Sequence, residues 1–307
     1  MGVWVVAALK RIPKSMVVTE QQKRRLEEEK FILEKVSSPF LCRGFESVET
    51  TDEIAFVQEY IEGRPLYECV WKYRETGRIP EHVAKFFAAQ LVLALRDLHA
   101  QGFAHRDFKS GNVLVAIDGF VKVIDFGLAK RIALDAGAAG DPTERTQSMV
   151  GTHYVMAPEV SLGVVIYEMV VGHPPWEYQC PPDSTMDAYF HRIECISSSP
   201  FQADTESHVA LSADLRSLVR SAFFSFQFSN RVLPRSNSHH DAQVMHHAWF
   251  QDIAWGLLEI KDASVVVLYD SNADYNAARV RTPARHESIS SAESVDPEDN
   301  AKYFADF

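Results

Sequence analysis

Apolar residues recur every three or four positions in two long stretches of the chain, which predicts two amphipathic helices. The first stretch covers residues 20–35 and the second covers residues 81–99. The apolar face of the first is formed by Leu26, Ile32, Leu33 and Val36, and that of the second by Val83, Phe86, Phe87, Leu91, Ala94, Leu95 and Leu98. We therefore expect each helix to bury one face against the rest of the protein.

Shorter apolar runs complete the predicted order of elements. A β-rich run at 4–12 precedes the first helix, and two or three short strands are expected between that helix and Tyr60. Further helices are predicted over 161–171, 213–228 and 243–260, followed by a polar, Ser-rich and acidic tail. Strands with one helix, followed by mostly helices, predict an α+β protein with a small mixed lobe on a larger helical lobe.

The amino-acid composition excludes several classes of protein but does not indicate a particular activity. Hydrophobic residues make up 46% of the 307 residues, which is enough for a sizeable core and unlike a disordered chain. The 42 acidic residues exceed the 31 basic ones and give a net charge of −11. This balance argues against nucleic acid or an anionic membrane as the main partner. Since no apolar run approaches the length of a membrane span, we expect no transmembrane helix.

Cysteine usage indicates the cellular compartment. The four cysteines at 42, 69, 180 and 195 form no C-x-x-C pair and no cluster with zinc-ligand spacing. The chain also shows no secretory signal. We therefore expect a reducing compartment, the cytosol or alternatively the nucleus.

An Asp-Gly dipeptide at 118–119 separates two apolar runs, 113–117 and 120–124, and predicts a two-residue hairpin turn. Pairing the strands outward from this turn places Asn112 opposite Asp125 at the open end. An amide oxygen and a carboxylate held there could share a hard cation such as Mg²⁺. Taken singly, each residue is more often an ordinary polar loop residue.

Three motifs appear in a fixed order around this hairpin. They are His-Arg-Asp-Phe-Lys-Ser-Gly-Asn at 105–112, Asp-Phe-Gly at 125–127 and Ala-Pro-Glu at 157–159. In this order the chain resembles the eukaryotic protein kinases, in which the motifs form the catalytic loop and the two ends of the activation loop. The resemblance implies a two-lobe kinase fold and transfer of phosphate from MgATP to hydroxyls of protein substrates.

The resemblance also assigns roles to individual residues. Asp107 would orient the substrate hydroxyl or accept its proton. Lys109 would neutralise charge on the transferring phosphoryl group, and lysine at this position is typical of Ser/Thr kinases. Asn112 and Asp125 would hold Mg²⁺.

Glu29 lies on the apolar face of the helix predicted at 20–35, where a carboxylate needs a cationic partner. Lys10, at the end of the first strand, is the obvious candidate, and the alternative is that Glu29 reaches solvent at the helix edge. The Lys10 partner matches the Lys–Glu pair of the kinases, whose lysine holds the ATP phosphates. The segment 58–61 resembles the hinge between the lobes, and the backbone of Glu59 and Ile61 would bind adenine.

The segment 148–152 resembles the activation-loop phosphosite of the AGC group of kinases. The resemblance implies that phosphate on Ser148, added by an upstream kinase, would pair with Arg106. Thr146 is a competing phosphosite. Thr152 would lie beside the catalytic Asp and Lys.

Two further pairs follow from the same resemblance. Glu159 would pair with Arg231 inside the large lobe. Phe304 and Phe307 at the end of the chain resemble the hydrophobic motif that AGC kinases dock on the small lobe.

On this basis we divide the chain into an incomplete kinase small lobe at 1–61, a large lobe at 62–256 and an AGC-type tail at 257–307. Within the AGC group the resemblance is strongest to the cyclic-nucleotide-dependent kinases. The segment 19–22 and the chain end favour the cGMP-dependent type, whereas 86–90 and 125–131 resemble the cAMP-dependent catalytic subunit. A cyclic-nucleotide-binding regulatory domain or subunit is therefore an expected partner.

The sequence departs from the family at two places. No Gly-rich loop precedes Lys10. In addition, Val160 runs directly into Ser161, so the start of the central large-lobe helix is missing together with the Asp that supports the catalytic loop. The main hypothesis is a Ser/Thr kinase of the AGC group, and the alternatives are a catalytically impaired scaffold or, less well supported, an ATP-binding protein of another kind.

AGC kinases that prefer basic substrates use several carboxylates to bind arginine. Pro65 and Gly111 stand at two of these positions, and Glu168 is the one carboxylate retained. A preference for basic substrates is therefore implied by the family rather than indicated by the residues.

Overall fold

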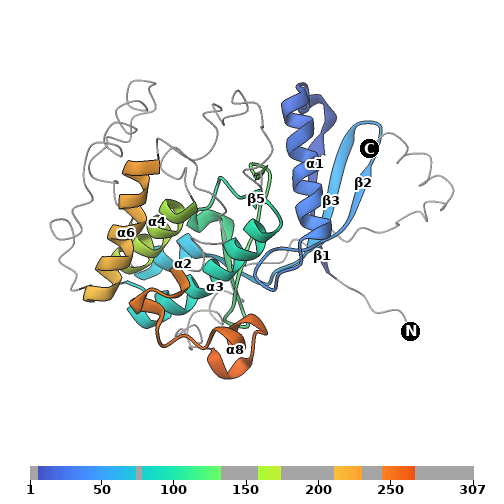
Figure 1. Ribbon diagram of the computed structural model, residues 1–307. Helices are drawn as coiled ribbons and strands as arrows, with labels where there is room; N and C mark the ends of the chain where they lie inside the picture. The colour runs from blue at the N-terminus through green and yellow to red at the C-terminus, as the bar shows by residue number, and fades with distance from the viewer. Residues whose placement is uncertain (1–5, 74–77, 133–157, 174–210, 230–243, 267–307) are drawn as a thin grey trace, which may run out of the picture.

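The computed structural model describes residues 6–73, 78–132, 158–173, 211–229 and 244–266. In these ranges a small lobe, made of an antiparallel sheet and one long helix, stands beside a larger helical lobe (Figure 1). The predicted two-lobe α+β architecture is thus confirmed. The tail assigned to 257–307 is described only as far as residue 266.

The sheet of the small lobe has the strand order β1–β3–β2 and is antiparallel throughout. Its strands are β1 (Ala7–Pro13), β2 (Gly44–Glu49) and β3 (Glu53–Glu59). The central strand β3 buries Ile54, Ala55 and Phe56, while β1 alternates between exposed and half-buried residues. This alternation follows from the two-residue repeat of a strand, which turns successive side chains to opposite faces.

Helix α1 (Glu20–Lys35) confirms the first predicted helix with the expected bounds. It begins at a capping box, in which the Thr19 side chain accepts the Gln22 N–H and the Gln22 side chain accepts the Thr19 N–H. Leu26, Ile32 and Leu33 are buried, as their spacing predicts. The cap fixes where the helix starts, and the apolar face fixes how it rotates against the sheet.

The large lobe is built around helix α3, which spans Glu81–Ala100 and confirms the second predicted helix. All its residues from Phe86 to Leu95 are buried. The other helices are α2 (Leu66–Tyr73), α4 (Pro158–Val171), α6 (Ala213–Ser229) and α8 (Trp255–Glu259). Helix α4 packs between α3 and α6, so the most apolar helices form the centre of the lobe.

Two small sheets connect this helical core to the lobe interface. One has the order β4–β6–β7, and the other pairs β5 with β8. The strands are β4 (Gly63–Pro65), β5 (Phe103–Ala104), β6 (Val113–Ala116), β7 (Val121–Val123) and β8 (Lys130–Arg131), and short 3-10 helices occur at η1 (Lys14–Met16), η2 (Ser110–Asn112), η4 (Ala248–Phe250) and η5 (Ala263–Val265). The buried Gln90 amide of α3 accepts the Val121 N–H at 2.7 Å, which fixes the β6–β7 hairpin on α3.

The predicted hairpin exists, but its register was predicted wrongly by one residue. Val115 pairs with Val121, and Ala116 pairs with Phe120 through a 2.8 Å hydrogen bond. The loop therefore has three residues and ends at Gly119, whose φ of +83° is the left-handed conformation such loops require. Asn112 consequently lies opposite Ile124, whose N–H it accepts, rather than opposite Asp125.

The helix predicted over 243–260 is also wrong as a continuous element. The chain there forms η4 and the short helix α8 instead. The His247 side chain accepts the Trp249 N–H, and the buried Trp249 indole donates to Glu81 on α3 at 2.8 Å. These tertiary contacts outweigh the local helical pattern. Within the described ranges, no helix is both long and apolar enough to cross a bilayer.

Candidate active site

The catalytic-loop residues follow β5 and close into the single turn η2 before β6. The Asp107 side chain is largely buried and is held from two sides. Its Oδ2 accepts a hydrogen bond from Lys109 Nζ at 2.7 Å and one from Asn112 Nδ2 at 2.9 Å. Asn112 Nδ2 also donates to the Asp107 carbonyl at 2.8 Å. The predicted trio Asp107, Lys109 and Asn112 is therefore one hydrogen-bonded cluster.

Lys10 and Glu29 form the predicted ion pair, with 2.6 Å between Nζ and Oε1. Glu29 is only 1% exposed, so the alternative in which its carboxylate reaches solvent is wrong. Burial raises the pKa of Glu29, and the nearby Lys10 cation counteracts part of this rise. Burial alone would lower the pKa of Lys10, but the Glu29 and Asp125 carboxylates outweigh it and raise that pKa. Lys10 therefore stays charged at neutral pH.

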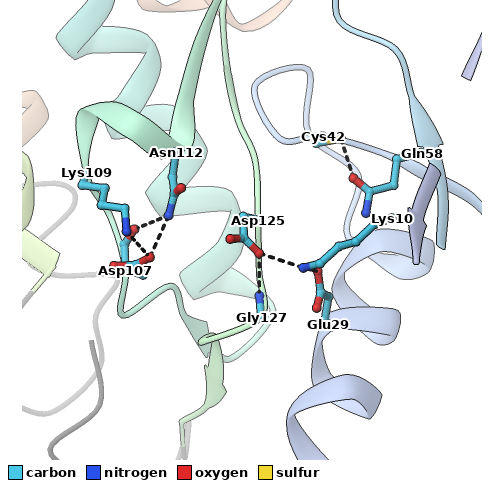
Figure 2. A network of polar contacts seen from close by, with 9 residues as sticks. All are labelled: Lys10, Glu29, Cys42, Gln58, Asp107, Lys109, Asn112, Asp125 and Gly127. Carbon is cyan, nitrogen blue, oxygen red and sulfur yellow. Dashed lines mark hydrogen bonds and ion pairs between the residues drawn. The ribbon is translucent and has the colours of Figure 1, made fainter. Parts of the chain in front are cut away.

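Asp125 lies between the Asp107 cluster and the Lys10–Glu29 pair (Figure 2). Its Oδ1 accepts Lys10 Nζ at 2.9 Å and the Gly127 N–H at 3.3 Å. Partial burial opposes ionisation, but the hydrogen bond and charge of Lys10 outweigh it and lower the pKa of Asp125. A Cβ at Gly127 would lie 3.3 Å from both Glu29 Oε2 and Asp125 Oδ1. Glycine at this position thus leaves room for the three ionised groups.

The oxygens that remain suit a magnesium ion. The Asn112 amide nitrogen is engaged by Asp107, so its Oδ1 is the atom available to a metal. Lys10 and Gly127 both bind Oδ1 of Asp125, which leaves Oδ2 without a partner among the described residues. Mg²⁺ is commonly bound by one or two such protein oxygens, with water and substrate phosphates completing its shell. Asn112 and Asp125 therefore fit the predicted metal-binding role.

The segment between β3 and β4 joins the two lobes, and the predicted adenine-binding residues lie at the end of β3 (Glu59) and within this segment (Ile61). The Glu59 carboxylate pairs with Lys122 at 2.5 Å and accepts the Arg43 N–H at 3.0 Å, which fixes the end of β3 on the large lobe. The Ile61 N–H donates to no acceptor in the described ranges. A backbone donor at this junction is the type of group that binds an adenine ring nitrogen.

His105 is completely buried beneath the catalytic loop, between the rings of Phe108 and Phe126. Its Nδ1 accepts the Asp107 N–H at 3.3 Å. Burial lowers the pKa of His105 to about 4, although the Ile124 carbonyl and the Asp107 carboxylate favour the charged form. The imidazole is therefore neutral in the folded protein and packs as an aromatic ring.

We expect His105→Phe to protect the protein against acid. Below about pH 6.5 the unfolded chain binds a proton on His105 that the folded chain does not bind until about pH 4, so acid favours unfolding. Between pH 7.5 and 5 this linkage costs the wild type about 2 kcal/mol of unfolding free energy. Urea unfolding at both pH values should show that the variant avoids this loss. Equal losses in the two proteins would contradict the assignment of a neutral buried His105.

Arg106, the predicted phosphate ligand, has a left-handed φ of +62° and donates from Nε to the Leu128 carbonyl at 2.8 Å. Burial and the nearby Arg25 cation lower its pKa, and Glu28 counteracts this in part. Arg25, one turn before Glu29 on α1, was not identified from the sequence. The two cations repel each other, and an anion bound beside Arg106 would relieve this repulsion.

Several predicted site residues lie outside the described residues. These are Thr152, Ser148, Arg231, Phe304 and Phe307, together with the competing phosphosite Thr146. Glu159 lies in the first turn of α4, at a position where the structure describes the backbone only. Their predicted roles stay predictions.

Helix α4 supports the catalytic loop through Glu168. The Ser110 hydroxyl in the loop donates to Glu168 Oε1 at 2.8 Å. The resemblance to the protein kinases implies a supporting Asp at the start of this helix, and α4, which spans Pro158–Val171, contains no Asp. The Ser110–Glu168 bond therefore connects α4 to the loop in place of that Asp. It also means that Glu168, the carboxylate expected to bind basic substrates, has a structural contact.

Arg131 on β8 connects helix α1 to the large lobe. Its guanidinium lies 5.0 Å from the ring centres of both Phe31 on α1 and Phe103 on β5. Its backbone N–H donates to Glu28 Oε1 at 3.0 Å. Since Glu28 and Phe31 flank Glu29 on the same helix, these contacts hold the helix that carries the Lys10 partner.

We expect Arg131→Ala to weaken MgATP binding about threefold and to lower the unfolding free energy by about 1 kcal/mol, because two cation–π contacts are lost. Arg131→Lys keeps the cation and should restore most of both. The control is Lys23→Ala, which removes an exposed cation of α1 paired with Glu20. Calorimetric titration and thermal unfolding measure the effects. If the Arg131 and Lys23 variants bind MgATP equally well, the coupling through α1 is wrong.

Comparisons with known proteins agree with this geometry. Residues 5–250 match the family model described as "Protein kinase domain". The chain is 30% identical to "cAMP-dependent protein kinase type 3" of Saccharomyces cerevisiae, over 81% of this chain and 58% of that protein. It is 26% identical to "Protein kinase 2" of Dictyostelium discoideum, over 85% and 51%, and 29% identical to "Protein kinase C zeta type" of Oryctolagus cuniculus, over 84% and 43%. The chain thus spans about half the length of these curated relatives.

Proposed function

This chain belongs to the protein kinase domain family and is of the AGC type, and from that premise we propose that it transfers the γ-phosphoryl group of MgATP to serine or threonine hydroxyls of protein substrates. The observation that carries the proposal is the convergence of Lys10, Glu29, Asp125 and the Asp107 cluster from separate parts of the chain (Figure 2). The pKa of Lys10 is raised and that of Asp125 is lowered, so both of these groups are charged at neutral pH.

The geometry supports a different role for each of these residues. The Asp107 carboxylate is fixed by Lys109 and Asn112, so it can orient a substrate hydroxyl and take its proton without rearranging. The Lys109 cation lies beside that carboxylate, where negative charge develops on the transferring group. Lys10 is held in place by Glu29 and presents its ammonium to nucleotide phosphates.

Magnesium supplies charge neutralisation of the phosphates when it is bound. Asn112 Oδ1 and Asp125 Oδ2 are the oxygens that would hold it. Asp125 also accepts a hydrogen bond from Lys10, so one carboxylate fixes the position of the phosphate-binding ammonium relative to the metal site.

The identity of the accepting residue tests the proposal. We would incubate the 307-residue chain with MgATP and matched peptide libraries that contain serine, threonine or tyrosine as the one hydroxyl residue, and locate the phosphate by mass spectrometry. The proposal expects phosphate on serine and threonine, because Lys109 is typical of kinases for those residues. Phosphate on tyrosine alone would overturn it.

A scaffold without catalysis is the second candidate, and one observation favours it. Helix α4 contains no Asp, so the Asp that supports the catalytic loop in the kinases has no counterpart in this helix. The Ser110–Glu168 hydrogen bond counts against this reading, since it supplies a different support for the same loop. A chain that binds MgATP but phosphorylates none of the libraries would favour the scaffold.

Regulation belongs to the same proposal. Phosphate on Ser148, added by an upstream kinase, would pair with Arg106, and the neighbouring Arg25 cation would strengthen the attraction for this anion. Within the AGC type we propose a cyclic-nucleotide-dependent kinase, of the cGMP-linked kind on the sequence resemblance. Two of the relatives named above are a cAMP-dependent kinase and a protein kinase C, which support the AGC type and do not separate cGMP from cAMP linkage.

A further inference from the structure

Gln58 is the penultimate residue of β3 and comes directly before the segment that joins the lobes. It is paired with Ala8 across β1 and β3, and Lys10 lies two residues further along β1. Opposed residues of an antiparallel pair point to the same face of a sheet, as do residues two apart on one strand. The Gln58 side chain therefore lies on the face of the sheet that carries Lys10 and its ion pairs.

Cys42 fixes which end of the Gln58 amide turns toward this site. The Cys42 thiol donates to Gln58 Oε1 at 3.6 Å. Burial, with help from the Glu59 carboxylate, raises the pKa of Cys42 to about 12, so the thiol stays protonated and remains a donor at neutral pH. Because the amide oxygen is engaged by the thiol, the amide nitrogen points the other way, toward the Lys10 side in Figure 2.

The Gln58 amide nitrogen is a hydrogen-bond donor that is not used within the described part of the protein. Among the described residues, no group accepts a hydrogen bond from it. The predicted hinge residues Glu59 and Ile61 come one and three positions after Gln58 along the chain. A donor at this point can therefore reach the part of a nucleotide base that lies next to the edge held by the hinge.

This inference rests on the proposed function. We propose that Gln58 binds the base of the nucleotide by donating a hydrogen bond from its amide nitrogen to N7 of the purine. The expected order of contacts supports this assignment. The hinge backbone at Ile61 and Glu59 would bind the N1 and N6 edge of adenine, and N7 is the next polar atom along the same side of the ring. N7 is an acceptor in every purine, which matches the N–H group that Gln58 presents.

The first experiment compares two nucleotides that differ only at N7, and the second repeats the comparison with variants of the protein. We would titrate the full chain with ATP and with 7-deaza-ATP, in which a C–H group replaces N7, in the presence of Mg²⁺ and by calorimetry. The wild type should bind 7-deaza-ATP about fivefold more weakly than ATP, because one hydrogen bond is lost and the amide donor is left unpaired. In Gln58→Leu, which keeps the size of the side chain and removes the donor, the two nucleotides should bind equally well.

Three further variants sharpen the result. Cys42→Ala removes the thiol that orients the amide and should reduce the fivefold preference, whereas Cys42→Ser keeps a donor and should retain it. Gln101→Leu makes the same substitution as Gln58→Leu at an exposed site and should also retain the preference. Melting temperatures confirm that each variant is folded.

Two outcomes overturn the inference in distinguishable ways. If the wild type and Gln58→Leu show the same ratio of the two affinities, Gln58 does not read N7, although MgATP binding and the proposed function stand. If the wild type binds neither nucleotide, the proposed function itself fails, and the inference fails with it.

Discussion

Asp107→Asn is expected to lower the rate of phosphoryl transfer by about a thousandfold while leaving MgATP affinity within about twofold of the wild type. The amide can still accept a hydrogen bond from Lys109, so the cluster around residue 107 should keep its geometry. It cannot accept the proton of a substrate hydroxyl. Single-turnover transfer to a serine peptide, together with calorimetric titration of MgATP, separates the chemical step from binding.

The matched control for this prediction is Asp52→Asn, which makes the same change at an exposed position in the loop between β2 and β3. This control should transfer phosphate at the wild-type rate. If the Asp107 and Asp52 variants had the same rate, Asp107 would not be the catalytic carboxylate.

The second large effect is expected at the Lys10–Glu29 pair. Lys10→Met leaves the Glu29 carboxylate buried without its cation, and should lower the unfolding free energy by about 2 kcal/mol. This is below the usual cost of breaking a buried pair, because the Lys10 side chain is 34% exposed. MgATP affinity should also fall at least tenfold, since the phosphates lose the ammonium. Denaturant unfolding and calorimetric titration measure the two losses.

A double variant separates stability from binding. Lys10→Met with Glu29→Met removes both charges, so it should regain most of the stability without regaining MgATP affinity. The control is Lys14→Met, since Lys14 pairs with Glu49 in the same lobe and its side chain is 35% exposed. Lys14→Met should bind MgATP like the wild type. Wild-type MgATP binding by the double variant would show that Lys10 does not hold the phosphates.

The sequence predicted the parts of the site that depend on local periodicity. The spacing of Leu26 and Leu33 fixed the face of helix α1 and therefore placed Glu29 inside, where only a cation such as Lys10 could partner it. The catalytic-loop residues were found for a different reason. Asp107, Lys109 and Asn112 are close in the chain, so one turn of 3-10 helix is enough to bring them together.

The incorrect predictions, of the hairpin register and of the long helix at 243–260, concern features that depend on backbone conformation or on contacts between residues far apart in the sequence. An Asp-Gly dipeptide fits a two-residue loop and a three-residue loop ending in Gly119, and only the backbone conformation distinguishes them. Trp249 was predicted within a long helix, but its indole is bonded to Glu81, far away in the sequence.

Gln58 was part of the predicted hinge segment 58–61, but its side-chain contact was not predicted, and neither was that of Arg131. Gln58 and Arg131 gain their roles from Cys42 and Phe31, which approach them only in the folded chain. No periodic pattern or motif marks such pairs, because each residue alone looks like an ordinary strand residue.

Kinase activity is tested most directly by asking whether the purified 307-residue chain transfers the γ-phosphoryl group of ATP to a peptide at all. We would supply ATP labelled at the γ-phosphate, Mg²⁺ and the serine peptide library, and follow label on the peptide with and without chelation of the metal. We expect label on serine that depends on Mg²⁺ and on Asp107. Binding of MgATP with no label on any peptide would contradict it.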